Sequence, residues 1–156
     1  SIPESAARAR KHPVRTEEGR PKGRKRSRAK QIINPPAMSA PRGYSHAVKK
    51  TGTPVFISGQ VAIDARDQLV GENDATAQVE QVFRNLRTVV EASGGTLDDI
   101  VKLTVYVTDA AYRPAVVAAR NRHFKEGRYP ASTYVVVTAL AVPQLLVEIE
   151  AVAMIE

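Results

Sequence analysis

PASTYVVVTALAVPQLLVEIEAVAMI, residues 130–155, is the stretch that decides the fold. It holds two β-rich runs, residues 133–138 and 145–155, separated by a segment that contains Pro143. Because strand side chains alternate between two faces, the second run predicts a long strand with one fully apolar face. That face carries Leu145, Val147, Ile149, Ala151, Ala153 and Ile155. The other face carries Leu146, Glu148, Glu150, Val152 and Met154.

Glu148 and Glu150 are two carboxylates among apolar neighbours on this second face. Burying an unpaired charge is costly. We therefore expect both side chains to line a groove or a sheet edge rather than the closed core.

The composition limits the possible functions. A chain of 156 residues suits one domain with at most a tail. The absence of cysteine excludes disulfides, a thiolate nucleophile and a cysteine-based zinc site. No apolar run is long enough for a membrane span, and the N-terminus lacks the apolar region of a secretory signal. We expect a cytoplasmic protein without membrane contact and, because His46 and His123 are isolated, without a metal or other cofactor.

The net charge of +7 belongs to one end of the chain. Residues 1–30 hold eleven Lys and Arg against three Glu, and the remainder holds twelve basic and thirteen acidic residues. We expect residues 1–38 to be a disordered basic tail and residues 39–156 to be the folded domain. The tail could be an RNA-binding or localisation arm, a transit peptide or a dispensable extension, and we favour the last.

The first half of the domain predicts strands followed by a helix. Residues 45–49 and 55–62 are expected to form a hairpin, with a third extended piece at residues 68–70. Asn73 or Asp74 can cap a helix that ends before two glycines. Its apolar face would carry Val79, Val82, Phe83, Leu86, Val89 and Val90.

The second half predicts a strand at residues 100–107 and a second helix, capped by Asp109, with Pro114 in its first turn and its end near Lys125. The final two strands are expected to pair as a hairpin. The element order predicts an α+β fold, a mixed sheet with two helices packed on one face. The uncovered face would expose an apolar patch, so we expect a symmetric oligomer that buries it.

Six segments, taken together, resemble the RidA/YjgF family over about residues 41–156. They read GYSHAV, FISGQVAID, AQVEQVFRNL, DDIVKLTVYVTD, YPAST and LVEIEAVA. The resemblance implies a chorismate-mutase-like (YjgF) fold, a homotrimer, and small-molecule sites in clefts between subunits. For the best-known branch it also implies hydrolysis of enamines and imines, such as 2-aminoacrylate, to a keto acid and ammonia.

The resemblance also implies the site residues. The pocket tyrosine falls on Tyr44, the serine-glycine pair on Ser58 and Gly59, and the pocket glutamate on Glu148. We expect Tyr44 and Glu148 to be catalytic, with Glu148 orienting a hydrolytic water, although an interface ion pair is an equally good role for Glu148. Ser58 and Gly59 would hydrogen-bond the ligand. An asparagine expected in the second helix is replaced by Val117.

The deaminating branch has an arginine after its Pro-Ala pair, where this chain has Ser132. A guanidinium binds a carboxylate through two charge-assisted hydrogen bonds, each worth about 1.5–3 kcal/mol. With Ser132 at the substrate-binding position, we expect weak 2-aminoacrylate turnover and a less anionic ligand. Arg120 or Arg128 could supply the missing charge from elsewhere. Two alternatives remain: an RNA-directed protein that uses the basic tail, and a ligand-binding trimer without catalysis.

Overall fold

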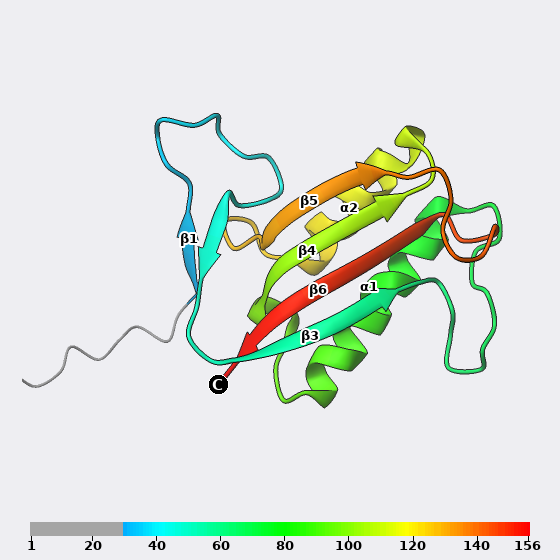
Figure 1. The fold of residues 1–156 in the computed structure, drawn as a ribbon, viewed down its shortest axis with the longest axis horizontal. Helices are drawn as coiled ribbons and strands as arrows, with labels where there is room; N and C mark the ends of the chain where they lie inside the picture. Colours follow the sequence, from blue (N-terminus) through cyan, green and yellow to red (C-terminus); the bar gives the residue numbers. More distant parts are fainter. Residues whose placement is uncertain (1–29) are drawn as a thin grey trace, which may run out of the picture.

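The computed structural model describes residues 30–156, and the expectations for residues 1–29 lie outside this part. A four-stranded sheet carries two helices on one face (Figure 1). The sheet elements and helices are β3 (Thr53–Gln60), α1 (Ala75–Ala92), β4 (Ile100–Val107), α2 (Arg113–His123), β5 (Ala131–Val136) and β6 (Val147–Ile155). The predicted α+β fold with both helices on one face is confirmed. Within the described residues, no helix combines the length and apolar character needed to cross a membrane.

The strand order is β3-β6-β4-β5, with β4 and β5 parallel and the other pairs antiparallel. The predicted hairpin of the last two strands is therefore wrong, because β4 lies between β5 and β6. The helix α2 joins the parallel strands β4 and β5, which places β5 at the outer edge of the sheet. The strand β6 is central, so neighbours satisfy its backbone hydrogen bonds on both edges.

The predicted hairpin of the first two strands is also wrong. The short strand β2 (Ala47–Lys49) pairs with β1 (Gln31–Ile33) in a separate two-stranded sheet. Gly52 has a φ of +137° and redirects the chain, so that Thr53 pairs with Ile155 of β6 instead of returning to β2.

The expected boundary at residue 38 does not fit the structure, because it cuts through ordered residues. The strand β1 lies within residues 30–38, and Gln31 pairs with Lys49. The apolar Ile32 and Ile33 allow this pairing, but the basic composition of the preceding residues hides them.

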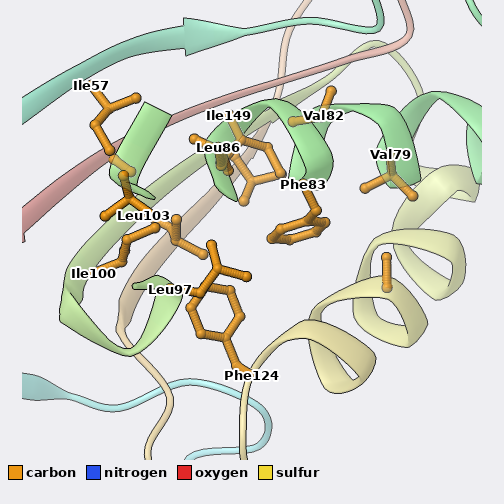
Figure 2. Packing of buried hydrophobic residues seen from close by; sticks show 14 of the residues in the cluster. Ile57, Val79, Val82, Phe83, Leu86, Leu97, Ile100, Leu103, Phe124 and Ile149 are labelled. Atoms are coloured by element: carbon orange, nitrogen blue, oxygen red, sulfur yellow. The ribbon is translucent and has the colours of Figure 1, made fainter. Parts of the chain in front are cut away.

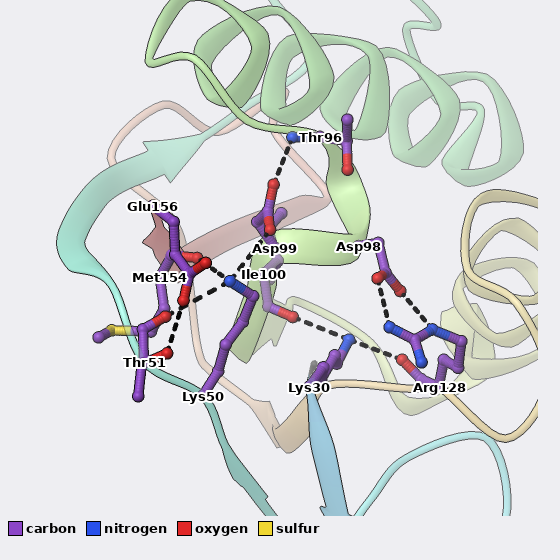
Figure 3. Close-up of polar contacts among 10 residues, drawn as sticks. All are labelled: Lys30, Lys50, Thr51, Thr96, Asp98, Asp99, Ile100, Arg128, Met154 and Glu156. Atoms are coloured by element: carbon purple, nitrogen blue, oxygen red, sulfur yellow. Dashed lines mark hydrogen bonds and ion pairs between the residues drawn. The ribbon is translucent and has the colours of Figure 1, made fainter. Parts of the chain in front are cut away.

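Lys30 attaches β1 to the rest of the domain (Figure 3). Its Nζ donates hydrogen bonds to the carbonyls of Ile100, at 3.1 Å, and Arg128, at 2.7 Å. Burial lowers the pKa of Lys30 to about 8. The neighbouring Arg128 forms a two-pronged ion pair with Asp98, with its Nε 2.9 Å from Oδ1.

The helix α1 begins as predicted, because Asp74 accepts a hydrogen bond from the N–H of Ala77 at 3.0 Å. It ends at Ala92, ahead of the predicted glycines. Asp109 instead caps a short 3-10 helix, Ala110–Tyr112, that precedes α2. The helix α2 ends at His123, two residues before the expected end near Lys125.

The core lies between the sheet and the two helices (Figure 2). The predicted inner face of β6 is buried throughout, as is Leu145 before it. In β4 an irregular register beside β6 places Ile100 in the core and leaves Val101 half-buried. Phe83 of α1 packs edge-on against Phe124, with ring centres 6.0 Å apart.

The other face of the sheet is open. Its side chains include Phe56, which is 79% exposed, as well as Val135. Glu148 and Glu150 also lie here, one half-buried and one exposed. The prediction that both avoid the core is confirmed, although β6 is a central strand and not an edge.

Glu80 of α1 connects the two helices. Arg122 donates to its Oε1, and Nε2 of His123 lies 2.9 Å from its Oε2. Partial burial raises the pKa of Glu80, but the hydrogen bonds and charges of Arg122 and His123 outweigh it, so the pKa lies below its ordinary value. The carboxylate therefore stabilises the fold when it is ionised.

We expect Glu80→Gln to lower the free energy of unfolding by about 1 kcal/mol at pH 7, a shift of about 4 °C in Tm. Since the folded pKa is depressed, this stabilisation is complete above the unfolded pKa and is lost as the pH falls through the folded value. Thermal unfolding of both proteins from pH 7 to pH 3 measures it. Glu91→Gln, an exposed change on the same helix, is the control. A Tm difference that does not depend on pH would contradict the role of the charge.

Candidate functional site

Glu148 lies directly over Gly59 on the open face of the sheet. Gly59 belongs to an irregular part of β3, where the register with β6 shifts between Ile57 and Gln60. A Cβ on Gly59 would lie 2.8 Å from Cδ of Glu148, so glycine leaves the space that the carboxylate occupies. The preceding residue, Ser58, is exposed. The structure thus brings three of the predicted site residues together at one irregularity of the sheet.

Tyr106 of β4 lies opposite Glu148 in the antiparallel pairing with β6. Its hydroxyl donates a hydrogen bond to Oε1 of Glu150 at 2.9 Å. This bond, together with burial and the charges of the two carboxylates, raises the pKa of Tyr106. The phenol therefore keeps its proton at neutral pH. Sequence analysis missed Tyr106, because its position depends on a strand register that the sequence does not specify.

Tyr44 and Val117 lie elsewhere, in the wall of a cavity of about 600 Å³ between α2 and two loops. Ser45 fixes the loop that carries Tyr44. Its Oγ donates to the carbonyl of Tyr129 at 2.6 Å, and its N–H donates to the carbonyl of Pro130 at 3.1 Å. The predicted pocket tyrosine therefore does line a cavity, on a loop held to the start of β5.

Ser132 lies on the helix side of the sheet. It is the register partner of Leu103, whose side chain is in the core. The hydroxyl of Ser132 is buried and has no hydrogen-bond partner among residues 30–156. It therefore points away from Glu148, which is on the open face.

One chain thus holds two separate groups of predicted site residues. Ser58, Gly59 and Glu148 are on the open face, whereas Tyr44 and Val117 line the cavity beside α2. The sheet separates its open face, which carries Glu148 of β6, from α2, which carries Val117 and packs on the other side (Figure 1). Within one chain, Glu148 is therefore not part of the wall of this cavity.

Two arginines of α2 line the same cavity as Tyr44. Arg113, Val117 and Arg120 are spaced i, i+4 and i+7, which places them along one face of the helix. The sequence left the location of Arg120 open and gave no reason to choose Arg113. The sequence did contain one indication of both arginines: at helical spacing, Arg113 and Arg120 share a face with Val117, which was already a candidate site residue. Arg128, the other candidate, instead pairs with Asp98.

The comparisons with known proteins fit this fold and these segments. The sequence model of the family described as "Endoribonuclease L-PSP" matches residues 35–155. The chain belongs to the RidA/YjgF family. The family and fold inferred from the six sequence segments are confirmed.

Relatives within the family carry different names. A "2-iminobutanoate/2-iminopropanoate deaminase" of Dermatophagoides farinae is 33% identical over 128 residues, which cover 81% of this chain and 98% of the relative. A solved structure of a Rid-family protein of unknown function from Yersinia pestis has a TM-score of 0.76 at 39% identity, covering 81% of this chain and 98% of that one. RidA from an Antarctic Psychrobacter has a TM-score of 0.61 at 38% identity, covering 75% and 92%.

The contact between Gly59 and Glu148 can be tested by a double-mutant cycle. We expect Gly59→Ala to cost about 1–3 kcal/mol of stability, because the new methyl group displaces the carboxylate. Gly59 does not have a positive φ, so its backbone accommodates alanine. In a Glu148→Ala background the same change should cost less than about 0.5 kcal/mol. Denaturant unfolding of the four proteins measures both values, and equal costs in the two backgrounds would contradict the contact.

Proposed function

We propose that this protein hydrolyses a reactive imine or enamine in clefts between the subunits of a homotrimer. The observation that carries the proposal is the separation of the two groups: a carboxylate over Gly59 on one surface, and a cavity beside Tyr44 on another. A second copy of the chain can bring one group against the other. The name of the mite relative, an imine deaminase, supports the reaction class.

The same geometry supports a ring-shaped assembly such as the proposed trimer. When one surface of a subunit contacts a different surface of the next, the interface is heterologous, and a rotation that closes produces a ring. Phe56 is 79% exposed on the open face, opposite Val152 of β6. An aromatic side chain in this position favours burial against a neighbouring subunit.

The proposed chemistry uses Glu148 as a general base. It takes a proton from a water molecule whose oxygen attacks the carbon of the C=N bond, and it returns that proton to the nitrogen, which gives a carbinolamine. The carbinolamine then collapses to a carbonyl compound and ammonia, as its hydroxyl proton passes through Glu148 to the departing nitrogen. The hydroxyl of Tyr44, from the neighbouring subunit, donates a hydrogen bond to the ligand, and Ser58 holds it by another. An enamine first accepts a proton on carbon and then reacts as the imine.

General-base catalysis contributes about 10²–10⁴-fold to a rate. We therefore expect Glu148→Ala to reduce ammonia release from 2-iminopropanoate at least 100-fold, with the protein still folded. A coupled assay of keto-acid formation from freshly generated substrate measures this, with Glu91→Ala as the control. No acceleration by the wild type with 2-iminopropanoate or 2-iminobutanoate would overturn the proposed reaction.

A negative charge introduced at Phe56 tests whether the open face of the sheet lies in the interface of the proposed trimer. We expect the wild type to have the mass of a trimer in light scattering after size exclusion, and Phe56→Glu to shift it toward the monomer. Val142→Glu introduces the same charge at an exposed apolar residue outside the sheet, and should leave the trimer intact. A monomeric wild type, or a variant at position 56 that stays trimeric, would contradict the proposed interface.

An RNA-directed function is the second candidate, because the matching family is described as an endoribonuclease. A solved protein from Thermotoga maritima, 37% identical to this chain, is likewise titled a putative endoribonuclease. The basic charge that would attract RNA is concentrated in residues 1–30, and the remainder of the chain has a balance of −1, from twelve basic and thirteen acidic residues. We favour the small-molecule reaction for this reason.

A further inference from the structure

Arg120 is a buried cation without a counter-ion in the part of the chain that the structure describes. Its side chain belongs to a residue that is only 7% exposed, and its Nε has no hydrogen-bond partner. No carboxylate of residues 30–156 lies within ion-pair distance of it. A buried unpaired charge is costly, so a folded protein retains one where something else compensates it.

The surroundings of Arg120 leave room for that compensating group. Arg120 lines the cavity of about 600 Å³ that also contains Tyr44 and Val117. Gly43 has a φ of +70°, and a Cβ there would lie 3.1 Å from Cζ of Arg120. Glycine at this position lets the guanidinium lie against the backbone of the loop that carries Tyr44.

Arg113 adds a second positive charge to the same wall. It lies two helical turns before Arg120. Its guanidinium carbon is 5.4 Å from the ring centre of Tyr134, which orients it. The lining also includes one carboxylate, Glu126, which is exposed and pairs with neither arginine. Positive charge therefore predominates in this wall of the cavity.

Burial lowers the pKa of Arg120, and the charge of Arg113 lowers it further, while Tyr129 has the opposite effect. Bringing two cations together in a partly enclosed cavity is unfavourable without an anion between or beside them. A planar carboxylate matches the fork of a guanidinium, with two parallel hydrogen bonds.

We propose that Arg120, assisted by Arg113, binds the carboxylate of the substrate and replaces the arginine that is absent at Ser132. The inference rests on the proposed function and names its substrate class as an imine that carries a carboxylate. The carboxylate is then held by the helix α2 and not by β5, and the expectation of a less anionic ligand, drawn from Ser132 alone, is revised.

The test measures binding of 2-oxobutanoate, the keto acid formed by hydrolysis of 2-iminobutanoate, to the full-length chain by calorimetry. We expect 2-oxobutanoate to bind at least tenfold more tightly than the neutral 2-oxobutanamide. Arg120→Met should weaken 2-oxobutanoate about 10- to 100-fold and leave the amide unchanged, since charge-assisted bonds of this kind are lost. Arg84→Met, which removes an exposed arginine of α1, is the matched control.

Two further variants distinguish a specific loss of binding from a loss of folding. Arg120→Lys keeps the charge without the planar fork and should bind 2-oxobutanoate with intermediate affinity. Adding Ser132→Arg to Arg120→Met should restore part of the affinity by placing an arginine at the family position. Without ligand, Arg120→Met should unfold at the same or a higher temperature than the wild type, because it removes an unpaired buried charge.

Unchanged binding of 2-oxobutanoate by Arg120→Met would overturn the inference. A lower Tm with loss of the trimer would overturn it too, because it would mean that Arg120 pairs with a carboxylate of a neighbouring subunit. These outcomes are separate from the proposed reaction, since binding of a keto acid needs no turnover. Imine hydrolysis that is unaffected by Arg120→Met would leave the function standing without this clamp. Binding of 2-oxobutanoate that depends on Arg120, without hydrolysis of imines, would support the carboxylate site and contradict the proposed reaction.

Discussion

The alternation of side chains along β6 is the constraint on which the rest of the molecule depends. Its inner side chains are buried against α1 and the neighbouring strands, and β3 and β4 hydrogen-bond to its two edges. Because the period is two residues, a shift of one residue would move Glu148 and Glu150 into the core. The cost of burying two carboxylates fixes the register, and that register places Glu148 above Gly59 and opposite Tyr106. The packing of the core thus also determines where the carboxylates lie on the other face of the sheet.

The same sheet separates the two halves of the candidate site. Side chains on the open face cannot reach the cavity beside α2 within one subunit, because the buried layer of the sheet lies between them. The open face also carries the exposed aromatic side chain of Phe56. Protein interfaces combine an apolar core with a polar rim, so a surface that carries both kinds of side chain is compatible with the proposed contact between copies.

Local patterns predicted both helices and the four strands of the main sheet, because each depends on residues close in sequence. The caps of α1, the alternation of β6 and the six family segments required no knowledge of pairing. The predictions of both hairpins were wrong, because strand pairing depends on contacts across the whole core and not on residues close in sequence. Thr53 pairs with Ile155, about a hundred residues away, since β6 offers an apolar face and two free edges. The family resemblance identified Tyr44 and Glu148. No local sequence pattern could predict that Tyr106 pairs with Glu148 and donates a hydrogen bond to Glu150.

Ser132 and Arg120 show why a motif alone misjudges this site. At Ser132 the family motif shows only that an arginine is missing. The effect of a positive charge depends on its distance from the ligand, so an arginine elsewhere in the sequence can have the same effect. The side chain of Ser132, near the start of β5, lies on the same side of the sheet as the helix α2, so an arginine at either position can face that side. The buried Nε of Arg120 is unpaired among the described residues, whereas Arg128 is already neutralised by Asp98. Moving the cation from strand to helix would preserve recognition of a carboxylate while changing where the rest of the ligand lies, and such a shift would alter the shape of the substrate that the scaffold accepts.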